Sequence, residues 1–261
     1  MSLSKVLLHL AYDGAAYDGW QSQPSGRGVQ DQVENALTQI FQQKLRLEGA
    51  SRTDAGVHAH AMPAHFEIGE GARMPPLRQL PLALNRFLPE DVRVVSAQAI
   101  PSTFHARFDA VGKTYAYRIW NHPAMHPLHR HYAWHIPTPL NVSAMRKAAK
   151  LLVGTHDFFA FTVTCPGELK DSVRTLHRCE ILDATPELQI LIEGSSFLYK
   201  MGRALAGLLV QVGQGKRLPE EIPLLFEGAR PSPDQRSGVI APAHGLALLE
   251  VNYPFPIGAV A

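Results

Sequence analysis

Hydrophobic and polar residues alternate loosely over residues 5–12, where branched side chains are frequent, and this pattern predicts a β-strand. A stretch rich in Gly, Pro and Ser over residues 19–28 follows and predicts a loop. Apolar residues then recur at helical spacing, with Gln, Asp and Glu between them: Val29, Val33, Leu37, Ile40 and Phe41. Such an apolar stripe is typical of an amphipathic helix that packs on one side against a core.

The rest of the chain repeats this mixture of strands and helices. Residues 45–68 predict two strands joined by a tight turn at Asp54-Ala55-Gly56. Further strands are predicted at residues 92–99, 113–120, 175–182, 188–194 and 246–251. Further helices are predicted around residues 80–87, 142–153 and 201–212. No regular βαβ order is present, so the predicted class is α+β with mainly antiparallel sheets. We expect two halves, residues 1–107 and 108–261, divided in the irregular stretch at 101–110.

Composition is that of an ordinary globular protein. The chain has 261 residues, 46% of them hydrophobic and 18% charged, which is enough to bury a sizeable core. No apolar run is long enough to span a membrane. The first 14 residues have one lysine and lack a small-residue cleavage site, so they predict a strand and not a signal peptide. The two cysteines, Cys165 and Cys179, form no disulfide framework, and a cytoplasmic protein is expected.

The formal charge of +2 permits nucleic-acid binding without demanding it. Cationic residues fall close together at three places in the sequence: Arg107, Lys113 and Arg118; Lys200 and Arg203; Lys216 and Arg217. A cluster of this kind is usually a solvated surface, so charge alone does not assign a function.

Residues 51–58, SRTDAGVH, carry the chemistry of greatest interest. An Asp-x-Gly between two strands is most often a turn, since Asp caps turns and Gly adopts positive φ. Here Arg52 precedes Asp54 by two residues and would share its face of an extended strand. A guanidinium there would keep the carboxylate ionised, or would bind an RNA phosphate. An ionised, positioned carboxylate can act as a nucleophile or a base.

The run RTDAGVHA at residues 52–59 resembles the signature of the TruA family of pseudouridine synthases, and further segments resemble this family in the same order. They are YDG at residues 12–14 with YDGWQSQ at 17–23, FHARF at 104–108 with KTYAYR at 113–118, GTHDF at 154–158, FLYKMGR at 197–203, and APAHGL at 241–246 with VNYP at 251–254. The sequence departs from the family at Ser51, where glycine is usual, and at residues 202–207, where Val-Arg-Asn is commoner.

This resemblance implies a pseudouridine synthase fold, with two mixed α/β halves around a basic cleft. It implies an isomerase that detaches uracil from C1′ of a uridine, turns it and rejoins it through C5. By resemblance, Asp54 is the essential aspartate, Tyr115 the active-site tyrosine and Arg203 a cation near the aspartate. Arg52 is a hypothesis for fixing Asp54. The sequence leaves open whether Asp54 attacks the sugar or removes a proton from C2′.

The resemblance also implies a partner and a place of action. The expected substrate is the anticodon stem-loop of tRNA at positions 38, 39 and 40, bound by a cytoplasmic homodimer. Flipping the base out requires stacking and phosphate contacts. Candidate RNA-binding residues are Arg27, Arg107, Lys113, Arg118 and Lys200, the last expected on the same helix face as Arg203. Neither a Walker loop nor a dinucleotide fingerprint occurs, and no cofactor or metal is expected.

Three other interpretations stay open. The protein could bind tRNA without catalysis, or act as a related synthase on another RNA. The histidines, grouped as His58, His60 and His65 and again at five positions between residues 121 and 139, could bind zinc in a hydrolase, although the second group lacks a helix or cysteines. The role of the His-rich segment 121–139 is left unassigned by the sequence.

Overall fold

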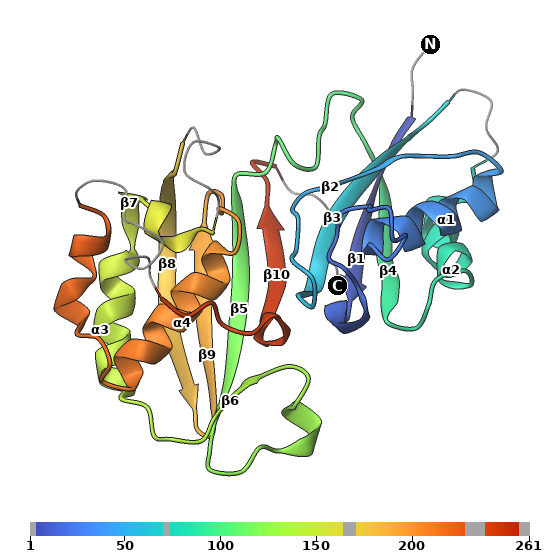
Figure 1. The fold of residues 1–261 in the computed structure, drawn as a ribbon. Coiled ribbons are helices and arrows are strands. Elements are labelled where there is room, and N and C mark those ends of the chain that lie inside the picture. Colours follow the sequence, from blue (N-terminus) through green and yellow to red (C-terminus); the bar gives the residue numbers. More distant parts are fainter. Residues whose placement is uncertain (1–3, 70–73, 164–170, 228–237, 256–261) are drawn as a thin grey trace. The chain divides into compact units, whose positions relative to one another are not determined.

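The computed structural model describes residues 4–69, 74–163, 171–227 and 238–255 (Figure 1). The chain divides into two compact units. Unit 1 comprises Met1–Val111 together with Leu248–Ala261, and unit 2 comprises Gly112–Ala247. The sequence placed the division after residue 107, close to where unit 1 first ends, but it assigned the C-terminal residues to the second half.

Unit 1 contains an antiparallel sheet with β1 (Ser4–Tyr12) between β4 (Val92–Ile100) and β3 (His58–Ile68). The short strand β2 (Leu47–Gly49) pairs with β3. Helices α1 (Val29–Phe41) and α2 (Leu80–Asn85) lie on one face of this sheet (Figure 1). Consecutive residues of β1, from Val6 to Leu10, are buried, so this strand is covered on both faces and belongs to the core.

Unit 2 contains the strand order β5 (Gly112–Asn121), β9 (Glu187–Gly194), β8 (Val173–Ala184) and β7 (Gly154–Asp157), all antiparallel. The short strand β6 (Trp134–Ile136) runs parallel to β5. Helices α3 (Val142–Leu152) and α4 (Met201–Gly213) cover one face of this sheet (Figure 1). The last strand, β10 (Leu246–Asn252), begins at the end of unit 2 and continues into unit 1.

Short 3-10 helices connect these elements: η1 (Gly14–Ala16), η2 (Leu77–Gln79), η3 (Pro127–His129), η4 (Phe159–Phe161), η5 (Pro219–Glu221), η6 (Pro223–Leu225) and η8 (Ala243–Gly245).

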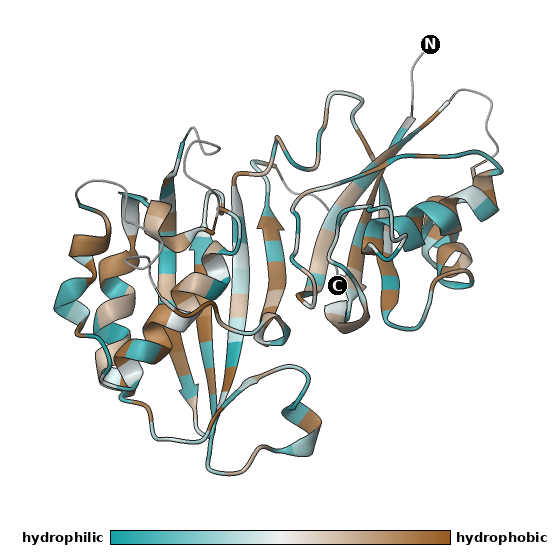
Figure 2. Ribbon diagram, in the orientation of Figure 1, coloured by the Kyte–Doolittle hydropathy of each residue, from teal (hydrophilic) through white to brown (hydrophobic). Residues whose placement is uncertain are grey.

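The predicted α+β class with mainly antiparallel sheets is confirmed. The periodicity that predicted strands and helices also explains their packing. Along β9, buried and half-buried residues alternate strictly. The hydropathy of β9 (Figure 2) is less regular, because residues 190–192 are all hydrophobic. In α4 only Arg203 and Gln211 keep partial exposure, so this helix is a core helix and not a surface one. None of the described helices is long and apolar enough to cross a membrane.

Candidate active site

Asp54 lies in the turn between β2 and β3 that the sequence predicted. The backbone amide of Val57 donates to the Asp54 carbonyl at 3.1 Å, and Gly56 takes a positive φ of 79° to close the turn. Asp54 is half-buried, Arg52 is exposed, and Thr53 between them is buried. The turn therefore leaves the carboxylate partly accessible while its neighbour is held in the core.

Hydrogen bonds from the first loop of unit 1 fix Thr53, the residue before the aspartate. The Tyr12 hydroxyl and the Thr53 hydroxyl form a buried hydrogen bond of 2.8 Å. The Trp20 amide donates to the Thr53 carbonyl at 3.1 Å. Because both contacts come from residues far away in the sequence, the position of Asp54 is set by tertiary structure and not only by its own turn.

Two glycines bring the first loop into direct contact with the Asp54 turn. A Cβ on Gly14 would overlap the Val57 carbonyl oxygen. A Cβ on Gly19 would lie 2.5 Å from the Thr53 carbonyl oxygen, and Gly19 has a positive φ of 99°. Side chains are excluded at both positions, so the YDG sequences at residues 12–14 and 17–19 have a structural reason for ending in glycine.

His58, four residues after the aspartate, completes this set of contacts. Its buried ring accepts a 3.1 Å hydrogen bond at Nδ1 from the Gly14 amide. The same atom lies 3.0 Å from Oδ1 of Asp13. The neutral ring with its proton on Nε2 accepts from Gly14, whereas a proton on Nδ1 would pair the ring with Asp13. Either form ties the first loop to the strand that follows Asp54.

Unit 2 holds the other two residues that the family resemblance selects. Tyr115 on β5 is buried, and its ring meets Phe197 edge to face with centroids 4.9 Å apart. Two residues on, the Tyr117 hydroxyl donates to the Pro242 carbonyl at 2.9 Å. Burial raises the pKa of Tyr117 well above its usual range, opposed by the positive charge of Arg203. Tyr117 therefore stays a neutral donor.

Arg203 projects from one of the two half-exposed positions of α4. Its Nε donates to the Ala241 carbonyl at 2.7 Å, while the Ala241 amide donates to the Arg203 carbonyl at 3.1 Å. This reciprocal pair fixes the base of the guanidinium against the segment that leads to η8. The family-like segments at residues 113–118, 197–203 and 241–246 thus contact one another within unit 2.

The predicted RNA-binding cations differ in their surroundings. Arg27 forms a two-pronged pair with Asp18, at 3.1 Å from Nε and 2.7 Å from Nη2, and this hydrogen bonding lowers the pKa of the Asp18 carboxyl. Arg107 is exposed, with its guanidinium carbon 5.8 Å from the Phe108 ring centroid. Lys113 on β5 is half-buried. The positive charge of Arg27 is therefore partly balanced within the protein.

Arg118 and Lys200 lie in unit 2. Arg118 Nε is 3.7 Å from Oε1 of Glu187. Lys200 caps the N-terminus of α4 in a left-handed conformation with φ of 60°, and its Nζ lies 4.9 Å from the Tyr199 ring centroid. The expectation that Lys200 shares a helix face with Arg203 was wrong, because Lys200 precedes the helix and i,i+3 spacing has no meaning there.

The predicted site residues are divided between the two units. Unit 1 holds Arg27, Arg52, Asp54 and Arg107, and unit 2 holds Lys113, Tyr115, Arg118, Lys200 and Arg203. The sequence suggested no role for Tyr12 or Gly14 and considered His58 only as a possible zinc ligand, although all three lie in segments that resemble the family. Their presence in those segments was the one indication that the sequence offered. Their contacts with the Asp54 turn and the strand after it join residues more than forty positions apart, so the sequence alone does not reveal them.

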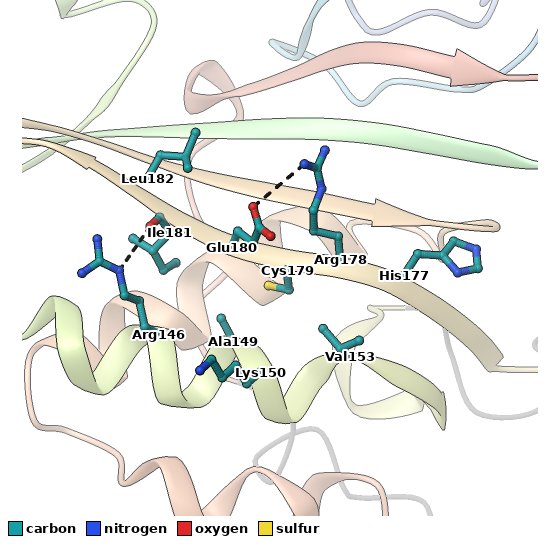
Figure 3. A pocket seen from close by; sticks show the side chains of 10 residues that line it. All are labelled: Arg146, Ala149, Lys150, Val153, His177, Arg178, Cys179, Glu180, Ile181 and Leu182. Carbon is teal, nitrogen blue, oxygen red and sulfur yellow. Dashed lines mark hydrogen bonds and ion pairs between the residues drawn. The ribbon is translucent and has the colours of Figure 1, made fainter.

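A separate hollow of about 390 Å³ lies in unit 2 between α3 and β8 (Figure 3). Arg146 Nε donates to the Ile181 carbonyl at 3.3 Å. Among the other residues that line the hollow, Nη1 of Arg178 lies 3.9 Å from Oε2 of Glu180. The buried Cys179 thiol forms part of its floor, and burial raises its pKa to about 12, so this thiol is unreactive. The hollow is lined by neither Tyr115 nor Arg203.

Within the described ranges, no three His, Cys, Asp or Glu side chains gather closely enough to hold a metal ion. The two groups of histidines noted in the sequence thus form no ligand set there. Cys165 lies outside the described residues.

Comparison with known proteins identifies the family. The family described as tRNA pseudouridine synthase matches residues 9–109 and 148–254. The chain is 40% identical over 251 residues to tRNA pseudouridine synthase A 2 of Clostridium tetani, covering 95% of this chain and 98% of that protein. It is 44% identical over 253 residues to tRNA pseudouridine synthase A of Syntrophotalea carbinolica, covering 96% and 97% of the two chains. With the Geobacter sp. strain M21 protein of the same name, identity is 41% over 253 residues, with coverage of 97% and 100%. The chain therefore belongs to the TruA family of tRNA pseudouridine synthases, which are isomerases.

Proposed function

We propose that this protein converts uridine to pseudouridine in the anticodon stem-loop of tRNA, and that Asp54 performs the reaction. The observation that carries this proposal is the support of the Asp54 turn. The turn is fixed on both sides of the aspartate, by Thr53 before it and by Val57 after it. A half-exposed carboxylate on a backbone fixed in this way is suited to repeated attack or proton abstraction at one position.

The reaction exchanges one glycosidic bond for another. The bond from C1′ to N1 of uracil breaks, the base turns, and a bond from C1′ to C5 forms. N1 ends with a proton, C5 loses its hydrogen as a proton, and there is no net redox change. Neither ATP nor an electron carrier is needed for this balance, so side chains alone can supply the chemistry.

Two mechanisms are possible, and they assign different roles to Asp54. In the first, its carboxylate attacks C1′ and the sugar is held covalently while the base turns. In the second, the carboxylate removes the proton at C2′ and a glycal forms. Transcripts with deuterium at C2′ of the target uridine separate them: a primary isotope effect on single-turnover rates marks the second route, and its absence together with a trapped Asp54 adduct marks the first.

Other residues support this chemistry in the proposal. The exposed Arg52 guanidinium helps to fix Asp54 or holds a phosphate of the bound RNA. Tyr115 stacks on the uracil, and its hydroxyl relays the proton at C5. Arg203 provides positive charge for the reacting nucleotide. The Arg203 guanidinium is suited to this because its Nε is already anchored on Ala241, so little side-chain entropy is lost when RNA binds.

For the substrate, we propose uridines at positions 38, 39 and 40. The candidates for holding the flipped-out nucleotide and its neighbours are Arg27, Arg107, Lys113, Arg118 and Lys200. We also propose that the protein works in the cytoplasm as a homodimer, with one tRNA contacting both subunits. Sequencing of pseudouridine positions in tRNA, with and without the enzyme, tests the positions. Sedimentation velocity tests the dimer.

The deciding experiment is tritium release from a tRNA transcript labelled with [5-³H]uridine. We expect release by the wild type and none by Asp54→Asn or Asp54→Ala, with tRNA affinity of both variants largely retained. Wild-type release rates in Asp54→Asn would refute the assigned role of the carboxylate. Absence of release by the wild type, with tRNA still bound, would support a tRNA-binding protein without catalysis or an enzyme for another RNA.

A further inference from the structure

The His-rich segment, residues 121–139, lies within a longer stretch, residues 110–156, that has no aspartate or glutamate. It contains five histidines and Arg130, and no aspartate or glutamate. Figure 1 shows it as an excursion that leaves the sheet of unit 2 after β5 and returns at β6. The segment therefore presents nitrogen donors over a continuous stretch with no carboxylate of its own to neutralise them.

Aromatic stacking holds this excursion in one conformation. The Trp120 indole at the end of β5 stacks on the His129 imidazole, with centroids 4.6 Å apart and planes 18° from parallel. His126 meets both rings, at 5.7 Å from Trp120 and 5.3 Å from His129. The rings of residues 120, 126 and 129 thus form a small aromatic cluster around η3, in which only Trp120 and His129 are stacked.

Hydrogen bonds fix both ends of the segment. Trp120 Nε1 donates to the Ala124 carbonyl at 2.9 Å. The Asn121 side-chain amide donates to the carbonyls of Ile136 and Thr138, at 2.9 and 2.7 Å. An excursion that is already ordered loses little conformational entropy when a ligand binds, which favours a binding surface over a passive loop.

Several donors of the segment face solvent. His126, Arg130 and His131 are exposed, and Arg130 uses Nη1 to cap the Pro127 carbonyl at 2.6 Å. Leu128 between them is 77% exposed. The fork of Arg130 and the neighbouring imidazoles therefore lie within a few residues of one another on an accessible turn.

A carboxylate from β9 lies at the base of this surface, and its charge is shared. Oε2 of Glu187 is 3.8 Å from Nδ1 of His129, and Oε1 of the same residue is 3.7 Å from Nε of Arg118. The Glu187 carboxylate thus lies between the Arg118 guanidinium and the His129 imidazole, and the positive charge of Arg118 offsets its negative charge. It joins the segment to Arg118, which the sequence already suggested as an RNA-binding residue.

We propose that the His-rich segment is a second RNA-binding surface of this protein, which holds backbone phosphates of the tRNA through Arg130, His126 and His131. This inference rests on the proposed function, since it assumes that tRNA is the substrate. The favoured partner is a polyanion because the segment lacks acidic residues, offers guanidinium and imidazole N–H donors, and is ordered before binding. Its role is to add affinity, not to take part in bond rearrangement.

The test compares two double variants that change the formal charge equally. Arg130→Glu with His131→Glu reverses charge on the His-rich segment. Lys150→Glu with His177→Glu makes the same change at exposed positions of α3 and β8 in the same unit. Fluorescence anisotropy with a labelled, unmodified tRNA transcript gives Kd for each full-length protein at several salt concentrations. Thermal unfolding checks that both variants are folded, and sedimentation velocity gives their oligomeric state.

We expect the segment variant to bind tRNA about tenfold or more weakly, and its slope of log Kd against log salt to fall by about 1 for each phosphate that it no longer binds. The control should stay close to the wild type. Equal weakening in both variants would reduce the effect to net charge and overturn the proposal. Unchanged tRNA binding by the segment variant would also overturn the proposal. So would weaker tRNA binding that a loss of self-association explains by itself, because the surface would then bind a second copy of the chain and not RNA.

Tritium release by the wild-type preparation separates this proposal from the proposed function. If the wild type releases tritium while the segment variant binds tRNA normally, only the second surface is refuted. If the wild type neither releases tritium nor binds tRNA, the proposed function fails and this inference fails with it.

Discussion

The backbone amide of Gly14 donates a 3.1 Å hydrogen bond to Nδ1 of His58, across 44 residues of sequence. The contact joins the first loop of unit 1 to the strand that starts just after the Asp54 turn. The same glycine packs its α-carbon against the Val57 carbonyl. The first loop can therefore pack this closely against the Asp54 turn only because residue 14 is glycine and has no side chain.

Replacing Gly14 by alanine should disturb the turn. The added Cβ would overlap the Val57 carbonyl oxygen, so the loop or the turn must move. Since a shift of about 1 Å in a catalytic group can lower rates about a hundredfold, we expect a fall in kcat of that order, measured in single-turnover tritium release. Gly69→Ala is the matched control, because a Cβ there meets nothing within 4 Å. A Gly14→Ala enzyme with unchanged kcat would show that this contact does not position Asp54.

The Tyr115 hydroxyl and ring can be tested apart. Tyr115→Phe keeps the edge-to-face contact with Phe197 and removes only the hydroxyl. If the hydroxyl relays the C5 proton, kcat should fall about 10²- to 10⁴-fold while tRNA affinity stays near wild type. Tyr115→Ala should also destabilise the buried site by about 3–5 kcal/mol, as for other large aromatic truncations. Equal kcat in Tyr115→Phe and wild type would leave Tyr115 a stacking residue only.

Arg203→Ala should weaken both tRNA binding and turnover, by about 1.5–3 kcal/mol for the removal of a charged hydrogen bond, or roughly ten- to a hundredfold in kcat/KM. Arg146→Ala provides the control, since Arg146 in unit 2 also donates through Nε to a backbone carbonyl. Steady-state rates and anisotropy are measured for both. Arg203→Lys should recover only part of the loss, because lysine keeps the charge but not the fork. Equal effects of Arg203→Ala and Arg146→Ala would indicate a structural role.

His65 makes stability depend on pH. Burial lowers its pKa to about 4 from an ordinary 6.5, with further repulsion from His105 and Lys5, and Nδ1 accepts from the Ala106 amide at 3.3 Å. The unfolded chain therefore takes up this proton at higher pH than the folded one. The stabilisation is fully present above pH 6.5 and is lost as pH falls towards 4, by roughly 2–3 kcal/mol.

Urea unfolding followed by tryptophan fluorescence at several pH values measures this dependence. His65→Gln should flatten the part of the curve between pH 6.5 and 4, whereas the exposed control His177→Gln should not. His9, whose pKa burial also lowers, is present in both variants and contributes equally to them. A wild-type slope retained in His65→Gln would assign the effect to another group.

Most of the fold could be predicted because hydrophobic periodicity survives in the sequence wherever a face is buried. The apolar stripe of α1 predicted this helix, and the apolar run before Gly194 predicted β9, both with nearly correct ends. The strand β7 was missed, since Gly154–Asp157 has four residues and little apolar content. The parallel pairing of β6 with β5 was also missed, because a three-residue strand carries no periodic signal.

The site was predictable only in part, for a different physical reason. The turn at Asp54 could be predicted because an Asp-x-Gly sequence favours a turn locally. The pairing of Arg27 with Asp18 could not be predicted, since the two residues are nine positions apart in a loop whose path is fixed by tertiary contacts. The hydrogen bond from Gly14 to His58 has the same origin. Lys200 was placed on a helix because the apolar stripe does not mark the first helical residue.

The discontinuity of unit 1 has a consequence for synthesis on the ribosome. The Tyr253 hydroxyl donates to the Ala106 carbonyl at 2.6 Å, and the Phe104 and Tyr253 rings lie 5.2 Å apart, so residues from the end of the chain complete the packing of the first unit. Unit 2 is continuous over Gly112–Ala247 and has all its residues before translation ends. The unit that carries Asp54 comes first in the chain but needs residues that follow unit 2 to complete its packing, so a nascent chain halted before Tyr253 lacks the contacts of Tyr253 with Phe104 and Ala106.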